Sequence, residues 1–451
     1  MHATILAAVA MVVLLCADYG MGSAMAIEAI SVPPAAPLAP DANRVAPAIR
    51  SLEDKVKQNP DDFVAYTKLA GYYLQRQRET GSNEYLTLAE RAARASLAVL
   101  PAEQNYGALA ALAQVEYALH NFTAARDHAT QLTELAPAKS SGFEILSDAL
   151  IELGEYDSAQ RALDRMQSLA GKTIDTQTRL GKYALLHGRP AEAARYLAEA
   201  LVLALDQSPP WRETVAWCRG QLGEIAFSVG DYHTAERHYR DALVTFPDYP
   251  RALAGLGRVR FARGDLHGAI EQYERAVRIV PEMTFVAALG DLYTLAGREK
   301  EAVAQHTLIE QIALLGRVSG TLYDRQRALF YADHDMKAAE AYQIAVKEYE
   351  VRRDIYGADA VAWTALKAGR LPEARAAIHE ALRLGTQDGR FYYHAGMIAR
   401  ALGRNDEART YLQRALRLNP RFQPIQADIA ERTLATLPGT PRPQAGEGKD
   451  G

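Results

Sequence analysis

One set of residue types recurs along this chain at a fixed interval of 34 positions. The clearest copies are Leu222-Gly223, Gly230, Ala235, Tyr239, Ala242 and Pro247, followed by Leu256-Gly257, Gly264, Ala269, Tyr273, Ala276 and Pro281. Small residues let two helices approach closely, a glycine between helices accepts a left-handed turn, and a proline ends a helix. The interval therefore predicts a stack of helix pairs, each built like the one before it.

This pattern resembles the tetratricopeptide repeat, a unit of 34 residues that forms two helices. The resemblance covers residues 48 to about 437 and implies an all-α fold, a right-handed superhelical solenoid of about ten helix-turn-helix repeats. It also implies a non-enzymatic scaffold or adaptor that binds a protein or peptide along its concave face, without a cofactor. The resemblance leaves the partner unnamed, because such repeats are general binding surfaces.

Less regular copies fill most of the remaining chain. The first full repeat carries Leu69-Ala70 and an insertion at residues 79–83, and the last two relate Gly369 to Gly403 at the same interval. Residues 318–350 are degenerate, so the sequence leaves open whether residues 318–359 form a bent repeat or a hinge. We divide the chain into an N-terminal segment (1–26), a Pro/Ala-rich linker (27–47), the solenoid (48–437) and a disordered tail (438–451).

The N-terminal 26 residues have most features of a signal peptide. Residues 5–16 form an apolar run that is short for a membrane span, and Ala24 and Ala26 fit a cleavage site after Ala26. Cleavage there would place the protein in the periplasm or outside the cell. The absence of Lys and Arg before Ala26 departs from the pattern, and the alternative is an uncleaved anchor in the inner membrane. Lipidation of Cys16 is less favoured, because bulky Leu15 precedes it.

Charge and cysteine content exclude some functions. Lys and Arg number 51 against 55 Asp and Glu, a net charge of -4, so no basic field exists to attract nucleic acid. After cleavage Cys218 would be the only cysteine, which excludes an intramolecular disulfide. We interpret Cys218 as a small buried apolar residue beside Trp217.

Motifs for catalysis are weak. Gly171-Lys172-Thr173 resembles the end of a phosphate loop, but Met166 stands where the leading glycine is needed. His233 and His238 are five residues apart and point in different directions, and we interpret both as part of a charged, solvated helix face. A metal-binding or hydrolytic protein that uses His233 with Glu236, or the turn from Asp333 to Asp335, is therefore a minor alternative.

The remaining candidates lie on the first helix of each repeat, which lines the inner wall in the family that this chain resembles. Aromatic and arginine side chains dominate binding energies at protein interfaces. We therefore favour an inner-wall set at the C-terminal half, with contributions from the middle: Trp217, Arg258, Tyr323, Arg327, Tyr331, Tyr356, Trp363, Arg390, Tyr393 and Arg400. Glu224, Phe227, Arg251 and Phe261 also fall on the predicted inner wall of the middle repeats. A second hypothesis is a membrane-anchored factor that assembles an envelope or secretion complex.

Overall fold

The computed structural model describes residues 27, 30–318 and 324–438, and every regular element in them is a helix. The predicted signal peptide, its cleavage site at Ala26, Tyr323 and nearly all of the predicted tail lie outside these residues. The helices are α3 (Ala42–Gln58), α4 (Phe63–Thr80), α5 (Glu84–Val99), α6 (Tyr106–Ala118), α7 (Phe122–Leu135), α8 (Ser140–Glu152), α9 (Tyr156–Ala170), α10 (Ile174–Leu186), α11 (Pro190–Leu205), α12 (Arg212–Ser228), α13 (Tyr232–Thr245), α14 (Pro250–Ala262), α15 (Leu266–Ile279), α16 (Met283–Leu295), α17 (Glu299–Val318), α18 (Arg325–Asp333), α19 (Ala338–Tyr349), α20 (Ile355–Lys367), α21 (Leu371–Leu382), α22 (Gly389–Ala401), α23 (Asn405–Leu418) and α24 (Gln426–Thr436).

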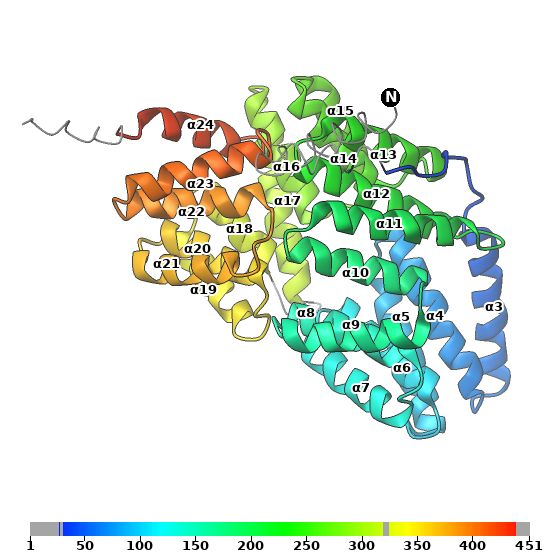
Figure 1. Cartoon of the computed structure of the whole chain (residues 1–451). Coiled ribbons are helices and arrows are strands. Elements are labelled where there is room, and N and C mark those ends of the chain that lie inside the picture. Colours follow the sequence, from blue (N-terminus) through cyan, green and yellow to red (C-terminus); the bar gives the residue numbers. More distant parts are fainter. Residues whose placement is uncertain (1–26, 28–29, 319–323, 439–451) are drawn as a thin grey trace, which may run out of the picture.

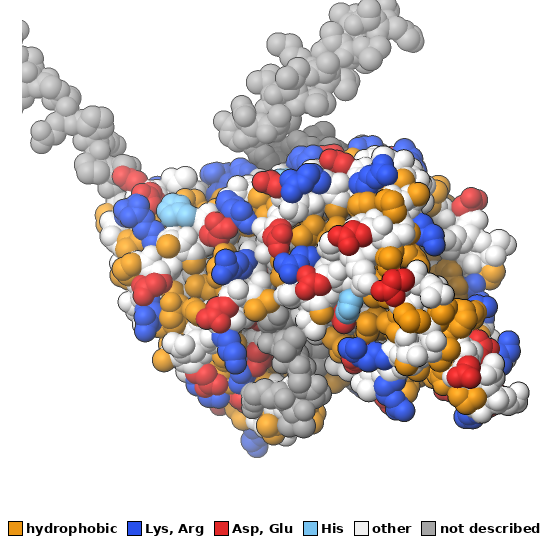
Figure 2. All heavy atoms as spheres, turned by 90° about the horizontal axis from the view of Figure 1, so that it is seen from below, with side chains coloured by type: hydrophobic (Ala, Val, Ile, Leu, Met, Phe, Trp, Pro, Cys, Tyr) orange, Lys and Arg blue, Asp and Glu red, His pale blue; other side chains and the backbone are white. Residues whose placement is uncertain are grey.

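Helices α4 to α23 form ten consecutive pairs that stack side by side, with α3 and α24 at the two ends (Figure 1). The predicted α-solenoid of helix-turn-helix repeats is confirmed. The degenerate stretch contributes the pair α18 and α19, in which α18 has only 9 residues. Figure 2 shows one face of this stack, where acidic and basic side chains alternate with apolar ones.

The repeated residue columns have a direct packing role. The ring of Tyr239 on α13 lies against Gly223 of α12 and Gly255 of α14, where an added Cβ would come within 2.6 and 2.4 Å of ring carbons. The tyrosine column therefore requires the glycine column, because any side chain at these glycines would displace the ring. Between the helices of a pair, the carboxylates of Asp231 and Asp265 accept hydrogen bonds from backbone N–H groups three residues on.

The superhelix closes on itself, which the sequence did not predict. Hydrogen bonds join partners 192 to 200 residues apart: Arg352 to Glu152, Ile355 to Tyr156, Thr386 to Leu186 and Asn419 to Phe227. This separation corresponds to about six repeats of 34 residues. In Figure 1 the green helices α10 and α11 accordingly lie beside the yellow and orange helices of the C-terminal third, and α9 and α10 share a hydrophobic core with α20, α21 and α22. We call this contact between successive turns the seam.

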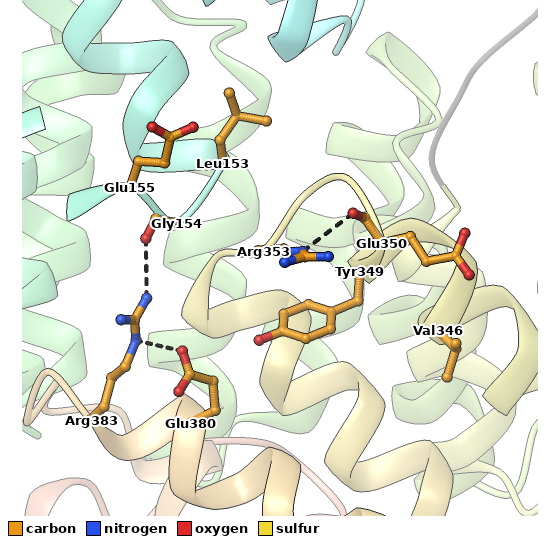
Figure 3. A pocket seen from close by; sticks show the side chains of 9 residues that line it. All are labelled: Leu153, Gly154, Glu155, Val346, Tyr349, Glu350, Arg353, Glu380 and Arg383. Atoms are coloured by element: carbon orange, nitrogen blue, oxygen red, sulfur yellow. Dashed lines mark hydrogen bonds and ion pairs between the residues drawn. The ribbon is translucent and has the colours of Figure 1, made fainter. Parts of the chain in front are cut away.

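Backbone approaches backbone closely at two points of the seam. A Cβ on Gly154 would lie 2.1 Å from the carbonyl oxygen of Arg353, and one on Gly188 would lie 2.2 Å from that of Gly385. Beside Gly154 the seam leaves a cleft of about 460 Å³. Figure 3 shows this cleft, in which the Arg383 guanidinium donates to the Gly154 carbonyl at 3.1 Å and pairs with Glu380.

A buried ionic network crosses the seam. The Arg352 guanidinium contacts Glu152, Glu348 and Asp354, and the Lys182 ammonium contacts Glu152 from the other side at 2.9 Å. Burial opposes the charged form of Glu152, but Lys182 and Arg352 outweigh it and hold the pKa of this carboxyl well below its usual range. The network links α8 and α10 in one turn to the α19–α20 region in the next.

The predicted linker at residues 27–47 differs from the structure. Its last residues belong to α3, which begins at Ala42 and contains Pro47 despite the backbone hydrogen bond that a proline removes. Burial of Val45 and anchoring of Asp41 against α12 stabilise this first turn, since both residues are at most 1% exposed. Residues 30–40 are extended and lie against the solenoid instead of acting as a free tether.

Candidate binding cavity

A hollow of about 830 Å³ is lined mainly by the first helices of successive pairs. Its wall consists of the first helices of four successive pairs, α12, α14, α16 and α18, and its C-terminal side consists of the turns before α22 and α24. The wall carries many aromatic and amide side chains, among them Phe227, Phe261, Phe285, Phe330, Tyr356, Phe422, Gln221, Gln326, Gln387, Gln423 and Gln426. Cavities of this size and character are typical of ligand sites.

The repeated tyrosine column fixes the charged groups on the middle of the wall. The Tyr239 hydroxyl donates to Glu224 at 2.8 Å and accepts from Arg258 at 3.1 Å, and Arg258 also pairs with Glu224. Burial, and then the Glu224 carboxylate, raise the pKa of Tyr239 well above its ordinary value. The Arg258 guanidinium in addition lies over the Phe227 ring at 4.7 Å. These contacts hold Arg258 in one orientation beside the cavity.

The C-terminal side of the cavity is lined by Arg390, Gln423 and Gln426. Among the residues that the structure describes, Arg390 Nε, Gln423 Oε1 and Gln426 Oε1 are buried and make no hydrogen bond, and Arg390 Nε lies 3.7 Å from Asp359 Oδ2 in an ion pair. Burial lowers the pKa of Arg390, but Asp388 and Asp359 outweigh it and raise the net value. Two amide side chains beside the cavity are therefore not fully hydrogen-bonded within the protein.

The structure brings only part of the predicted site together. Arg258, Tyr356 and Arg390 line the cavity. Four others are buried in the core: Arg327, Tyr331, Trp363 and Tyr393, which are 7%, 0%, 2% and 1% exposed. Trp217 packs half-buried against the core around Cys218, Arg400 is exposed away from the cavity, and Tyr323 lies outside the described residues.

Four of the predicted residues therefore pack in the core instead of facing the inner wall, and partner binding by the rest of the set stays a prediction. Trp363 illustrates the reason: its Nε1 donates to Asp333 at 2.9 Å and its ring stacks on His394 at 4.2 Å, so the side chain packs between repeats. The middle set fares better, because Glu224, Phe227, Arg251, Arg258 and Phe261 all line the cavity. Residues 386–389 and 419–426 were missed, since only closure of the superhelix brings them to the wall.

The histidines that the sequence singled out have structural contacts. His238 is only 2% exposed, so its assignment to a solvated face is wrong, whereas Glu236 beside His233 pairs with Arg240 and Arg263. His334 Nε2 contacts Asp291 at 2.8 Å instead of being capped by its neighbours. Cys218 is fully buried as predicted, and burial raises the pKa of its thiol to about 12.

The described part of the chain lacks two features. No group of three or more His, Cys, Asp or Glu side chains within it is arranged to hold a metal ion. None of its helices is both long enough and apolar enough to cross a membrane.

Comparison with known proteins gives one family and several solved structures. The tetratricopeptide-repeat model matches residues 221–284 and 360–421. Similar structures include PilW, a widely conserved type IV pilus biogenesis factor, at 18% identity over 46% of this chain and 93% of that one, with a TM-score of 0.37. YrrB, a TPR protein with an unusual peptide-binding site, matches at 15% identity over 44% and 96%, with a TM-score of 0.30. A monomeric mutant of IFIT1 with Gppp-AAAA matches at 14% identity over 74% and 76%, with a TM-score of 0.47.

No curated protein matches the sequence. The ten stacked pairs and their repeated glycine, tyrosine and alanine columns define an α-helical repeat protein. The family model matches the two most regular stretches, so residues 221–284 and 360–421 carry tetratricopeptide repeats. Proteins of this class are in general scaffolds for interaction with other proteins.

Proposed function

We propose that this protein is a non-enzymatic scaffold of the cell envelope that binds a short extended segment of a partner protein in the cavity inside its superhelix. The observation that carries the proposal is the cavity wall, which combines aromatic side chains, a fixed Arg258 and the amide side chains of several glutamines. Aromatic rings supply apolar area, and amide side chains can supply directed hydrogen bonds to a peptide backbone.

The size of the cavity restricts the partner to a segment of chain. A volume of about 830 Å³ is within the range of sites for ligands of drug size and is too small for a folded domain. Charges on the wall are nearly balanced, because Glu224 and Arg258 pair with each other and Asp291 pairs with His334. We therefore expect the segment to carry apolar side chains and little net charge.

The cellular location is part of the proposal. The apolar run at residues 5–16 and the small residues before position 27 support export with cleavage after Ala26, and N-terminal sequencing of the mature protein tests it. A mature chain that begins at Met1 would instead favour the membrane-anchored assembly factor. Both forms present the same cavity.

The experiment is a pull-down from envelope extract with the purified chain and two matched variants. Gln326→Trp places a large side chain at an exposed position of the cavity wall, and Gln114→Trp makes the same change at an exposed position of α6 outside the cavity. We expect the first variant to lose the partner at least tenfold and the second to retain it, with equal helicity by circular dichroism. Equal retention by both variants would contradict binding in the cavity.

A further inference from the structure

Residues 30–41 of the chain lie against α12 and α13, and we call the surface that they cover the groove over α12 and α13. We call these residues the strap. Ile30, Val32 and Leu38 pack against the core formed by α11, α12 and α13, while Ser31, Pro34, Ala36 and Pro37 remain exposed. In Figure 1 the strap is the dark blue trace that runs from the start of α3 toward α13.

The groove recognises the backbone of the strap through one buried arginine. Arg219 is 0% exposed, and its Nη2 donates to the carbonyl oxygens of Pro33 at 2.9 Å and Pro34 at 3.0 Å. Its Nη1 contacts Asp241 of α13 at 3.3 Å, which orients the guanidinium. Burial lowers the pKa of Arg219, so the two carbonyl contacts replace solvation that the guanidinium has lost.

The end of the strap is fixed separately. The Asp41 carboxylate accepts from the backbone N–H groups of Arg212 and Glu213, both at 2.9 Å, and so caps the first turn of α12 from a position 171 residues earlier in the chain. Arg44 donates to the carbonyls of Pro209 and Pro210 and lies 3.6 Å from the centre of the Trp211 ring. The start of α3 is therefore held independently of the Arg219 contacts.

These contacts select a class of segment rather than one sequence. Arg219 bonds main-chain carbonyls, which every peptide has, and adjacent prolines hold the chain extended with carbonyls but no N–H groups to satisfy. The apolar contacts come from three side chains, at positions 30, 32 and 38, that are only half-buried. We propose that the groove over α12 and α13 is a binding site for extended, proline-containing segments, and that the strap is its intramolecular occupant and competitor.

This proposal is independent of the cavity, and a full-length chain with a weakened strap tests it. Ile30→Ser, Val32→Ser and Leu38→Ser together remove the three half-buried apolar contacts of the strap and leave Arg219 and Asp41 unchanged. The probe is a fluorescent synthetic peptide with the native sequence of residues 30–41, and fluorescence anisotropy measures its binding. We expect binding at least tenfold tighter than to the native chain, where the tethered strap competes at a millimolar effective concentration.

Two controls separate recognition by Arg219 from general stickiness. Adding Arg219→Lys to the weakened chain removes the planar pair of donors and keeps the charge beside Asp241, and we expect at least tenfold weaker binding. A peptide with sulfur in place of the Pro33 and Pro34 carbonyl oxygens weakens the acceptors without altering the protein, and we expect severalfold weaker binding. No binding of the native peptide to the weakened chain, or binding that neither control reduces, would overturn the proposal.

Discussion

The seam makes a prediction that the two closely approached glycines can test. Gly154→Ala and Gly188→Ala in one chain place Cβ atoms within 2.1 and 2.2 Å of carbonyl oxygens in the next superhelical turn. The matched control is Gly369→Ala with Gly403→Ala. These glycines occupy the same place between the helices of a pair, with φ of 73° and 74° against 76° and 67°, and an added Cβ there meets no atom within 4 Å.

The two doubly substituted chains share one cost and differ in another. Alanine at positive φ costs about 1 kcal/mol per residue, so each double should lose about 2 kcal/mol from backbone strain. At the seam the two turns must also separate by about 1 Å before carbon and oxygen reach a tolerable distance. That separation breaks the hydrogen bonds from Ile355 N to the Tyr156 hydroxyl and from Thr386 to the Leu186 carbonyl, together with the Arg383 contact to Gly154.

At about 1 kcal/mol for each of these three hydrogen bonds, the seam double should lose about 5 kcal/mol in total against about 2 kcal/mol for the control. Urea unfolding measures both free energies, and small-angle X-ray scattering measures the radius of gyration. We expect the seam double to be expanded at low denaturant and the control to match the unmodified chain. Equal losses and equal radii for the two doubles would refute a closed superhelix in solution.

Three further predictions concern single side chains. Arg352→Ala leaves buried carboxylates of the seam without their partner and should cost about 3–5 kcal/mol in urea unfolding, whereas Arg126→Ala, which removes exposed ion pairs, should cost less than about 1 kcal/mol. Asp41→Ala should cost about 1–2 kcal/mol, because two N–H groups of α12 lose their acceptor, and hydrogen exchange should speed up at the first turn of that helix. Burial lowers the pKa of His238 from 6.5 to about 4, so the unfolded chain binds a proton more readily than the folded chain. The free energy of unfolding should therefore fall as the pH drops from 6.5 toward 4, by about 2 kcal/mol at pH 5. His238→Gln should remove this loss when urea unfolding is measured at pH 7 and pH 5.

The local elements of this fold were predictable because each repeat encodes its own helix pair. Gly223 and Tyr239 are in register at the sequence level, and the structure places one against the other. Asp231 and Asp265 directly follow the repeated glycines and accept hydrogen bonds from the first turn of the next helix. The pair of α18 and α19 forms even though its copy of the repeat is irregular, because the neighbouring pairs present matching apolar faces.

The binding site was harder to predict than the fold. Within a single turn of the first helix of a repeat, some side chains face the inner wall and others pack between helices. The type of a side chain therefore does not reveal which of the two surfaces it joins. Tyr331 and Trp363 satisfy the same pattern as Tyr356, yet they are buried in the core and only Tyr356 reaches the cavity. The aromatic residues of the first helices predicted large side chains on the inner wall, but they did not reveal which of these residues lie there.

The sequence by itself determined the helix pairs, their number and their order, because the interval of 34 acts between neighbours and depends only on local packing. The tertiary structure decided whether the superhelix stays open. Closure depends on a small rotation at each pair, summed over about six of them, which brings Gly154 to Arg353 and Asn419 to Phe227. The sequence of a single repeat does not reveal the total rotation, so the seam, the enclosed cavity and the groove under the strap can be seen only in the folded chain.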